Sequence, residues 1–128
     1  MSFIKELKKV EQIDCPISHV FSDGVYSRTI TMPKGTFVVG KKHLTEHLNI
    51  ISVGKAKVWM NGIIKTVEAP AIINSGKNCR KILLIEEDML WTTIHVTNET
   101  DLDIIEKQII SNEEPKELEN IIKELQCI

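Results

Sequence analysis

Hydrophobic and polar residues alternate in short runs through the middle of the chain, from about residue 20 to residue 96. Turn-forming pairs such as Asp23-Gly24 and Asn61-Gly62 separate these runs. Short strands with a turn every 8–12 residues or so are typical of an antiparallel sandwich or barrel. Asn61-Gly62 is the strongest hairpin signal, because both residues tolerate a positive φ.

The two ends of the chain show helical spacing instead. Ser2 is expected to cap a short N-terminal helix that ends before Pro16. After the β region, Thr100 is expected to cap a helix with one apolar face, and a second helix follows, so that two helices occupy about residues 100–127. The pattern predicts a mainly β protein with a short N-terminal helix and two C-terminal helices, in one domain spanning 1–128. The apolar stripe of the last helix comprises Leu118, Ile121, Ile122 and Leu125.

Composition places the chain among ordinary globular proteins. Apolar residues make up 42% of the 128 residues and charged residues 27%, which excludes disordered and collagen-like classes. No apolar run approaches the roughly 18 residues of a membrane span, and the N-terminus lacks the apolar core of a secretory signal. Cys15, Cys79 and Cys127 are far apart and odd in number, so no disulfide framework is indicated and a cytoplasmic location is expected.

The charge of the chain is divided between its middle and its end. Residues 28–81 carry ten basic and two acidic residues, a net charge of +8, whereas residues 82–128 carry twelve acidic residues against three lysines, a net charge of −9. A basic middle attracts an anion such as a phosphate or a nucleotide. Alternatively, the acidic end neutralises the basic middle, within one chain or between two. Nucleic acid is disfavoured as a partner, because aromatic residues are only 5% and no nucleic-acid-binding module matches.

One spacing within the β region stands out. Gly35 is followed after five residues by Lys41, then by His43, by His47 after three more, and by Gly54 after six more. This spacing resembles the first motif of the cupin superfamily, which runs glycine, five residues, His-x-His, three or four residues, glutamate, six residues, glycine. Here His43 matches the second histidine, while Lys41 replaces the first and His47 replaces the glutamate.

The second cupin motif is reduced to Gly76 and Cys79, with Cys79 at the histidine position. The resemblance implies a small cupin jelly-roll barrel whose interior is the ligand site. It also implies that a divalent metal ion, if one binds, takes His43, His47 and Cys79 as ligands. Because Lys41 is a cation without a lone pair, it disfavours a metal, and no particular cofactor is predicted.

Alternation along the strands selects further candidates for the interior. Lys41 and His43 continue the apolar row of Phe37 and Val39, so they are expected to point inward. Arg28 likewise stands in a row of largely apolar residues. On the last strand, two faces alternate. The more apolar face is expected to meet the core or the C-terminal helices, which leaves Trp91, Thr93 and His95 on a polar lumen or on solvent. That apolar face comprises Leu90, Thr92, Ile94 and Val96.

These observations predict a binding protein whose lumen holds a small anionic ligand, nucleotide-like or phosphorylated. The alternatives are a metal-dependent cupin enzyme, an isomerase or an oxygenase, and an assembly module. The chain is similar overall to small cupin-like proteins carried by tailed phages, which implies a protein that sequesters a nucleotide in the host cytoplasm, or an accessory virion protein. A homo-oligomer, most simply a dimer formed through the C-terminal helices, is also expected. The predicted ligand-binding residues are Arg28, Lys41, His43, His47, Arg80, Trp91 and His95.

Overall fold

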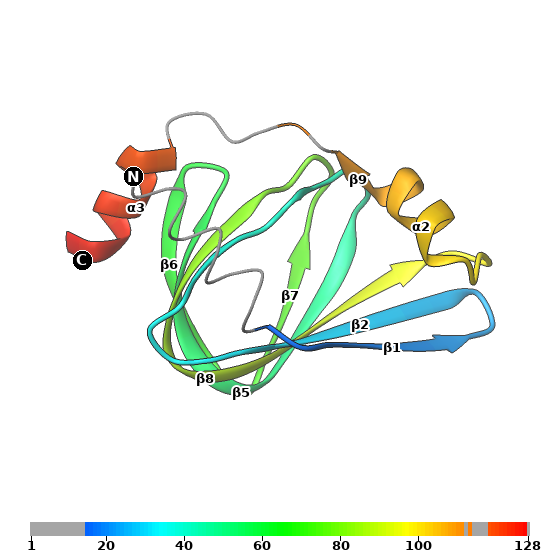
Figure 1. The fold of residues 1–128 in the computed structure, drawn as a ribbon, viewed down its shortest axis with the longest axis horizontal. Coiled ribbons are helices and arrows are strands. Elements are labelled where there is room, and N and C mark those ends of the chain that lie inside the picture. The colour runs from blue at the N-terminus through cyan, green and yellow to red at the C-terminus, as the bar shows by residue number, and fades with distance from the viewer. Residues whose placement is uncertain (1–14, 112, 114–117, 128) are drawn as a thin grey trace.

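The computed structural model describes residues 15–111, 113 and 118–127. The expected N-terminal helix falls outside this part of the chain. The described residues form a mainly β protein with two helices, which confirms the predicted fold class (Figure 1). The elements are β1 (Ile17–Ser22), β2 (Val25–Met32), β3 (Phe37–Val39), β4 (Lys42–His43), β5 (His47–Met60), β6 (Ile63–Glu68), β7 (Ala71–Ser75), β8 (Lys81–Val96), α2 (Leu102–Ile109), β9 (Ile110–Ser111) and α3 (Leu118–Cys127).

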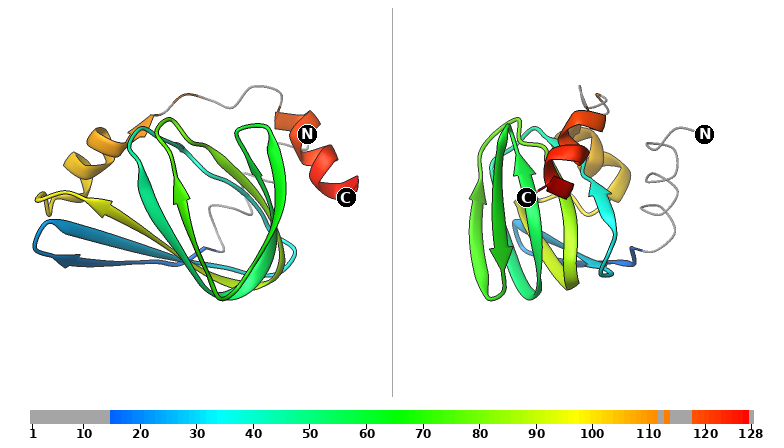
Figure 2. Two further views of the ribbon diagram at one scale, coloured as in Figure 1. Left: turned by 180° about the vertical axis from the view of Figure 1, so that it is seen from behind. Right: turned by 90° about the vertical axis from the view of Figure 1, so that its left-hand side faces the viewer.

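Two long strands, β5 and β8, organise the sheet. They pair antiparallel with each other over most of their length. The first part of β5 also pairs with β7, and its second part pairs with β6. In the same way, β8 pairs first with β3 and then with β2, which pairs with β1. The long strands therefore belong to both halves of the fold, and the sheet is strongly curved (Figures 1 and 2).

The bend in β5 lies at a register irregularity between Ile51 and Ala56. Gly54 sits there with φ +100°, in the left-handed region that L side chains rarely adopt. A Cβ on Gly54 would lie only 2.4 Å from the carbonyl oxygen of Asp88 on β8. This glycine lets two strands approach closely where both turn. At the other end of β5, Asn61 and Gly62 have positive φ and form the predicted hairpin to β6.

Each described helix closes one part of the sheet. Helix α3 places its apolar stripe on an outer surface formed by residues such as Phe37 and Ile82, and all four stripe residues are buried in this chain. Helix α2 buries Ile105 and Ile109 beside Tyr26 of β2, at the end of the molecule where β8 and β2 lie (Figure 1). Neither described helix combines the length and the apolar character that a membrane span requires.

Three local predictions about these elements were wrong. Asp101 rather than Thr100 caps α2, because its carboxylate accepts from the backbone N–H groups of Asp103 and Ile104. Phe37 does not share a face with His43: it packs under α3, while His43 lines the cavity, since Gly40 and Lys41 interrupt the strand between β3 and β4. Val39 both packs against the α3 cluster and lines the cavity.

The third wrong prediction concerns the more apolar face of β8. Leu90, Thr92 and Ile94 lie on the outside of the sheet and are half-buried, and Val96 is 88% exposed. This face carries no helix among the described residues, because α3 covers the opposite end of the strand, near Ile82 and Leu84. The apolar stripe of α3 is satisfied within the chain, and the homo-oligomer stays a prediction.

The close approach at Gly54 can be tested by adding one methyl group. Gly54→Ala is expected to lower the free energy of unfolding by about 3 kcal/mol, since it combines a strained φ with overlap of the β8 backbone. The matched control is Gly76→Ala, where an added Cβ meets no atom within 4 Å. Urea denaturation of both variants measures the difference. Equal stabilities for the two variants would contradict this account of the bend.

Candidate functional site

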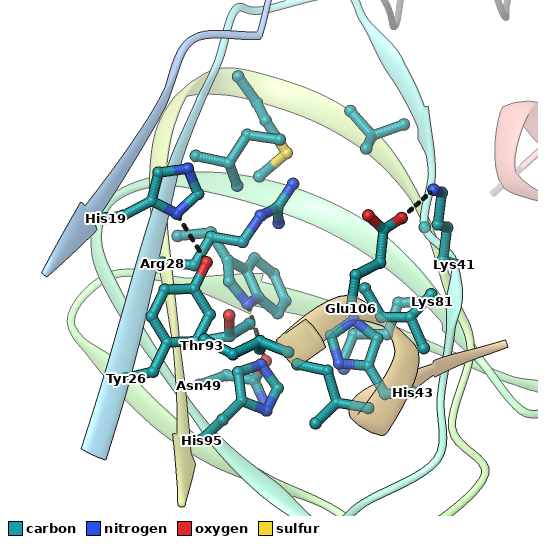
Figure 3. Close-up of a pocket in the computed structure, with 18 of the residues that line it drawn as sticks. His19, Tyr26, Arg28, Lys41, His43, Asn49, Lys81, Thr93, His95 and Glu106 are labelled. Atoms are coloured by element: carbon teal, nitrogen blue, oxygen red, sulfur yellow. Dashed lines mark hydrogen bonds and ion pairs between the residues drawn. The ribbon is translucent and has the colours of Figure 1, made fainter. Parts of the chain in front are cut away.

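A cavity of about 380 Å³ lies inside the curved sheet, beneath α2. Its wall combines apolar side chains with polar groups from β1, β2, β5 and β8 (Figure 3). A second hollow of about 330 Å³ lies toward β6 and β7. Lys81 and Trp91 line both hollows and so stand between them. A pocket of this size, mostly apolar with a few polar groups, is typical of a small-molecule site.

Three histidines meet beside this cavity: His43 and His95 line it, whereas His47 is not among the lining residues. His43 comes from β4, His47 from the start of β5 and His95 from the end of β8. Their rings lie against one another, with centroids 4.4 Å apart for His43 and His47, 4.8 Å for His47 and His95, and 5.3 Å for His43 and His95. One ring nitrogen from each lies within 4.8 Å of the other two. The three side chains therefore converge on one point.

Backbone pairing fixes each histidine. Leu48 pairs with Ile94, which sets His47 beside His95 on neighbouring strands. His43 exchanges two backbone hydrogen bonds with Cys79, at 2.8 and 3.0 Å, and also pairs with Ile110 of β9. Because β9 follows α2 directly, the helix over the cavity and the histidine inside it are held by one short piece of sheet.

All three imidazoles are kept uncharged. Burial lowers the pKa of His43 to about 2 and that of His95 to about 4, with a further contribution from neighbouring positive groups. Burial also lowers the pKa of His47, against a hydrogen bond to Thr45 that raises it. Protonating one ring here would place a charge in an apolar cavity beside two other rings. Near neutral pH, each ring therefore offers a lone pair.

The hydrogen bonds of the cluster are incomplete. His43 Nδ1 and both ring nitrogens of His95 are buried and have no hydrogen-bond partner among the described residues. His47 Nδ1 lies 3.1 Å from the Thr45 carbonyl oxygen, which can only accept. The proton of His47 is therefore on Nδ1, and its Nε2 carries the lone pair.

Lys81 reaches this lone pair, since its Nζ lies 3.4 Å from His47 Nε2. Burial lowers the pKa of Lys81, and the side chain is among the few buried charged groups of the chain. A lysine at this point competes with any other group for His47. The sequence analysis missed Lys81, because the register of β8 against β5 is set by pairing that the pattern of residues does not reveal.

The donor set fits a transition-metal ion. Three neutral imidazoles with convergent lone pairs suit zinc, iron, nickel or copper, and unsatisfied buried nitrogens are costly unless a ligand completes them. Cys79, which the cupin resemblance implies as a ligand, is buried but is not among the converging donors. His95 takes its place, and the sequence predicted it as a ligand-binding residue of the lumen but not as a metal ligand.

Of the other predicted site residues, some line the cavity and others do not. Arg28 and Trp91 line the cavity, as expected of them, and the indole Nε1 of Trp91 donates to Asn49 Oδ1 at 2.9 Å. Lys41 lies at the cavity edge, with a side chain 56% exposed and ion-paired to Glu106 of α2 at 2.9 Å. Arg80 is absent from the lining and donates instead to the backbone carbonyl of Glu113. The ion pair of Lys41 with Glu106 agrees with the alternative interpretation of the charge pattern, whereas Arg80 meets a backbone carbonyl rather than a carboxylate.

Comparison with solved structures shows a shared fold. The chain resembles an RmlC-like cupin with a double-stranded β-helix from Methanocaldococcus jannaschii (TM-score 0.57, 11% identity, 66% of this chain and 81% of that one). It also resembles a predicted oxalate decarboxylase from Thermotoga maritima (0.53, 14%, 65% and 81%). A third similar structure is the DMSP lyase DddQ from Ruegeria pomeroyi (0.58, 14%, 68% and 49%).

These likenesses define a cupin fold, as the motif spacing predicted. No family model matches the sequence, and no curated protein matches it. What the chain does is therefore argued from the cavity and its histidines.

Because the histidines are uncharged in the folded chain, the stability of the metal-free protein is expected to depend on pH. The pKa of His95 falls from 6.5 in the unfolded chain to about 4 in the folded one, so the unfolded state binds more protons between these values. The contribution of His95 to the free energy of unfolding is therefore fully present above pH 6.5. It is lost as the pH falls toward 4, and the loss is on the order of 3 kcal/mol. His43 extends the loss to lower pH. Thermal melts in EDTA from pH 7.5 to 4 measure it.

The matched variant for this experiment is His95→Leu, which removes a buried titrating ring and is expected to flatten the pH dependence. A melting temperature of the unaltered protein that stays constant across this range would contradict the buried, neutral cluster.

Proposed function

We propose that this chain is a metal-binding cupin, which holds a divalent transition-metal ion on His43, His47 and His95 and binds a small organic molecule in the adjoining cavity. The observation that carries the proposal is the convergence of three uncharged histidines, of which His43 Nδ1 and both ring nitrogens of His95 are buried without a partner among the described residues. An ion bound there supplies Lewis acidity toward a substrate oxygen. Three protein ligands leave coordination positions open, which is the arrangement of catalytic rather than structural sites.

The residues around the cluster give it a largely apolar surrounding. Helix α2 contributes Ile105 and Ile109 to the cavity wall. Trp91, held by Asn49, forms a rigid wall. Similar folds named as a lyase and as a predicted oxalate decarboxylase show that enzymes occur on this architecture. We therefore place a metal-dependent enzyme ahead of a metal-free binding protein.

The second candidate is the nucleotide-like or phosphorylated ligand that the sequence predicts, held by a sequestering protein. Arg28 and Trp91 favour it, since both line the cavity. Two of its expected cations, Lys41 and Arg80, are engaged elsewhere, which weakens the case for a multiply charged ligand. Native mass spectrometry of the purified protein separates the candidates: the first predicts one metal ion per chain, and the second predicts a nucleotide without metal.

The identity of the ligands is tested by substitution. His43→Ala, His47→Ala and His95→Ala are each expected to lower zinc or cobalt affinity at least a hundredfold, because each removes one of three bonds. Cys79→Ser is the matched control and is expected to retain one equivalent of metal, measured by elemental analysis after gel filtration. Loss of metal in Cys79→Ser with retention in His95→Ala would restore the ligand set implied by the motif and refute this one.

Substitution of Lys81 is expected to raise the affinity for metal, whereas substitution of the histidines lowers it. Lys81→Met removes a group that competes for His47 Nε2 and a positive charge beside the ion, so zinc affinity is expected to rise at least tenfold. Lys65→Met, on the exposed hairpin strand β6, is the control and is expected to change affinity less than twofold. Competition titration with a chromophoric chelator measures both. Weaker zinc binding in Lys81→Met would show that Lys81 supports the centre instead.

A further inference from the structure

Arg28 is a cation that points into the cavity without a partner. It lies on the inner face of β2 between Tyr26 and Ile30, and Figure 3 shows its guanidinium group directed into the pocket. Its side chain makes no hydrogen bond or ion pair with any residue that the structure describes. Arg28 is half-buried, and its guanidinium group carries five N–H donors in a planar arrangement that suits a planar anion. Its position therefore indicates an anionic ligand.

The two lysines that line the cavity already have partners within the chain. Lys41 is paired with Glu106 at the rim, and Lys81 is directed at His47. Among the described lining residues, Arg28 thus supplies the one unengaged positive charge. A single guanidinium matches a single carboxylate in charge and in its flat, two-oxygen geometry. A phosphate monoester carries more charge and would call for further cations.

A second unsatisfied group lies beside Arg28. Thr93 of β8 is the direct cross-strand partner of Arg28, so both side chains stand on the same face of the sheet. The Thr93 hydroxyl is buried and has no hydrogen-bond partner among the described residues, and the residue is 7% exposed. Two residues farther along the same face of β8 lies His95, whose ring nitrogens also lack partners. Guanidinium, hydroxyl and imidazole form one continuous polar strip.

The rest of the cavity wall is largely apolar. Side chains from β2, β3, β8 and α2 surround the polar strip, and they offer a ligand dispersion contacts rather than hydrogen bonds. The available space of about 380 Å³ suits a small molecule. The apolar lining residues are Ile30, Met32, Val38, Leu83, Ile105 and Ile109.

We infer that Arg28 and Thr93 form a carboxylate-binding subsite beside the histidine centre, so that the substrate is a small organic acid with an apolar body. Arg28 pairs with the carboxylate through two N–H groups, and the Thr93 hydroxyl donates to one of its oxygens. This orients the rest of the molecule along the strip toward the histidines. The inference deepens the proposed function and rests on it only for the ion at the far end.

The experiment measures ligand affinity by calorimetry with zinc-loaded and with EDTA-treated protein. The probes are butyrate and benzoate, with the uncharged butyramide and benzamide as matched ligands, and with inorganic phosphate and AMP as alternatives. An acid is expected to bind at least tenfold more tightly than its amide. Arg28→Gln is expected to weaken acid binding tenfold to a hundredfold and to remove the preference for acid over amide. Thr93→Val is expected to weaken it to a smaller extent.

Two controls test whether the effect is specific to Arg28. Lys41→Met removes the rim cation and is expected to change acid affinity less than twofold, and Arg28→Gln is expected to retain one equivalent of bound zinc. Equal effects of Lys41→Met and Arg28→Gln would overturn the subsite, since general electrostatic attraction would then suffice. Binding of AMP or phosphate without either acid, or of no probe at all, would also overturn it. Arg28-dependent acid binding in protein that takes up no zinc would support the subsite while refuting the metal centre.

Discussion

The antiparallel pairing of β5 with β8 is the constraint on which both the fold and the site depend. These two strands run through both halves of the sheet, so their common bend creates the hollow. The same pairing sets His47 beside His95, although 48 positions separate them in the chain. Gly54 makes the bend sterically permissible, because Asp88 and Met89 occupy the space where a side chain would stand. Disturbing this contact would therefore alter the histidine centre as well as the stability of the sheet.

Burial of the three histidines explains the chemistry of the centre. An imidazole in an apolar cavity remains neutral and retains its lone pair, but it also loses the hydrogen bonds that water would supply. His47 recovers one of these through Thr45, and it meets Lys81 with its other nitrogen. His95 recovers none from the described residues. A folded chain that leaves such groups unsatisfied is less stable than one in which a ligand completes them, so ligand binding and folding stability are linked.

The sequence predicts the fold better than the site. Turn residues and two-residue alternation locate the β region, the hairpin at Asn61-Gly62 and the common face of Trp91, Thr93 and His95, because these depend on local geometry. The site depends on pairing between distant strands. Lys41 appeared to face inward because alternation was extended through Gly40, where the strand is interrupted.

Cys79 appeared to be a ligand because a motif position was matched without knowledge of its side-chain direction. His95 and Lys81, at opposite ends of β8, reach the same centre only because that strand bends. The charge pattern also depends on contacts between distant parts of the chain. Lys41 pairs with Glu106 and Lys42 pairs with Glu113, both in the acidic end of the same chain.

The most direct test of the histidine centre is the position of a bound metal in crystals grown with zinc or cobalt. Anomalous diffraction at the absorption edge of the metal locates the ion independently of activity or affinity. The account predicts one strong peak in the cavity, about 2.1 Å from a ring nitrogen of each of His43, His47 and His95. A peak bound to Cys79 instead of His95, or no peak within the cavity, would contradict it.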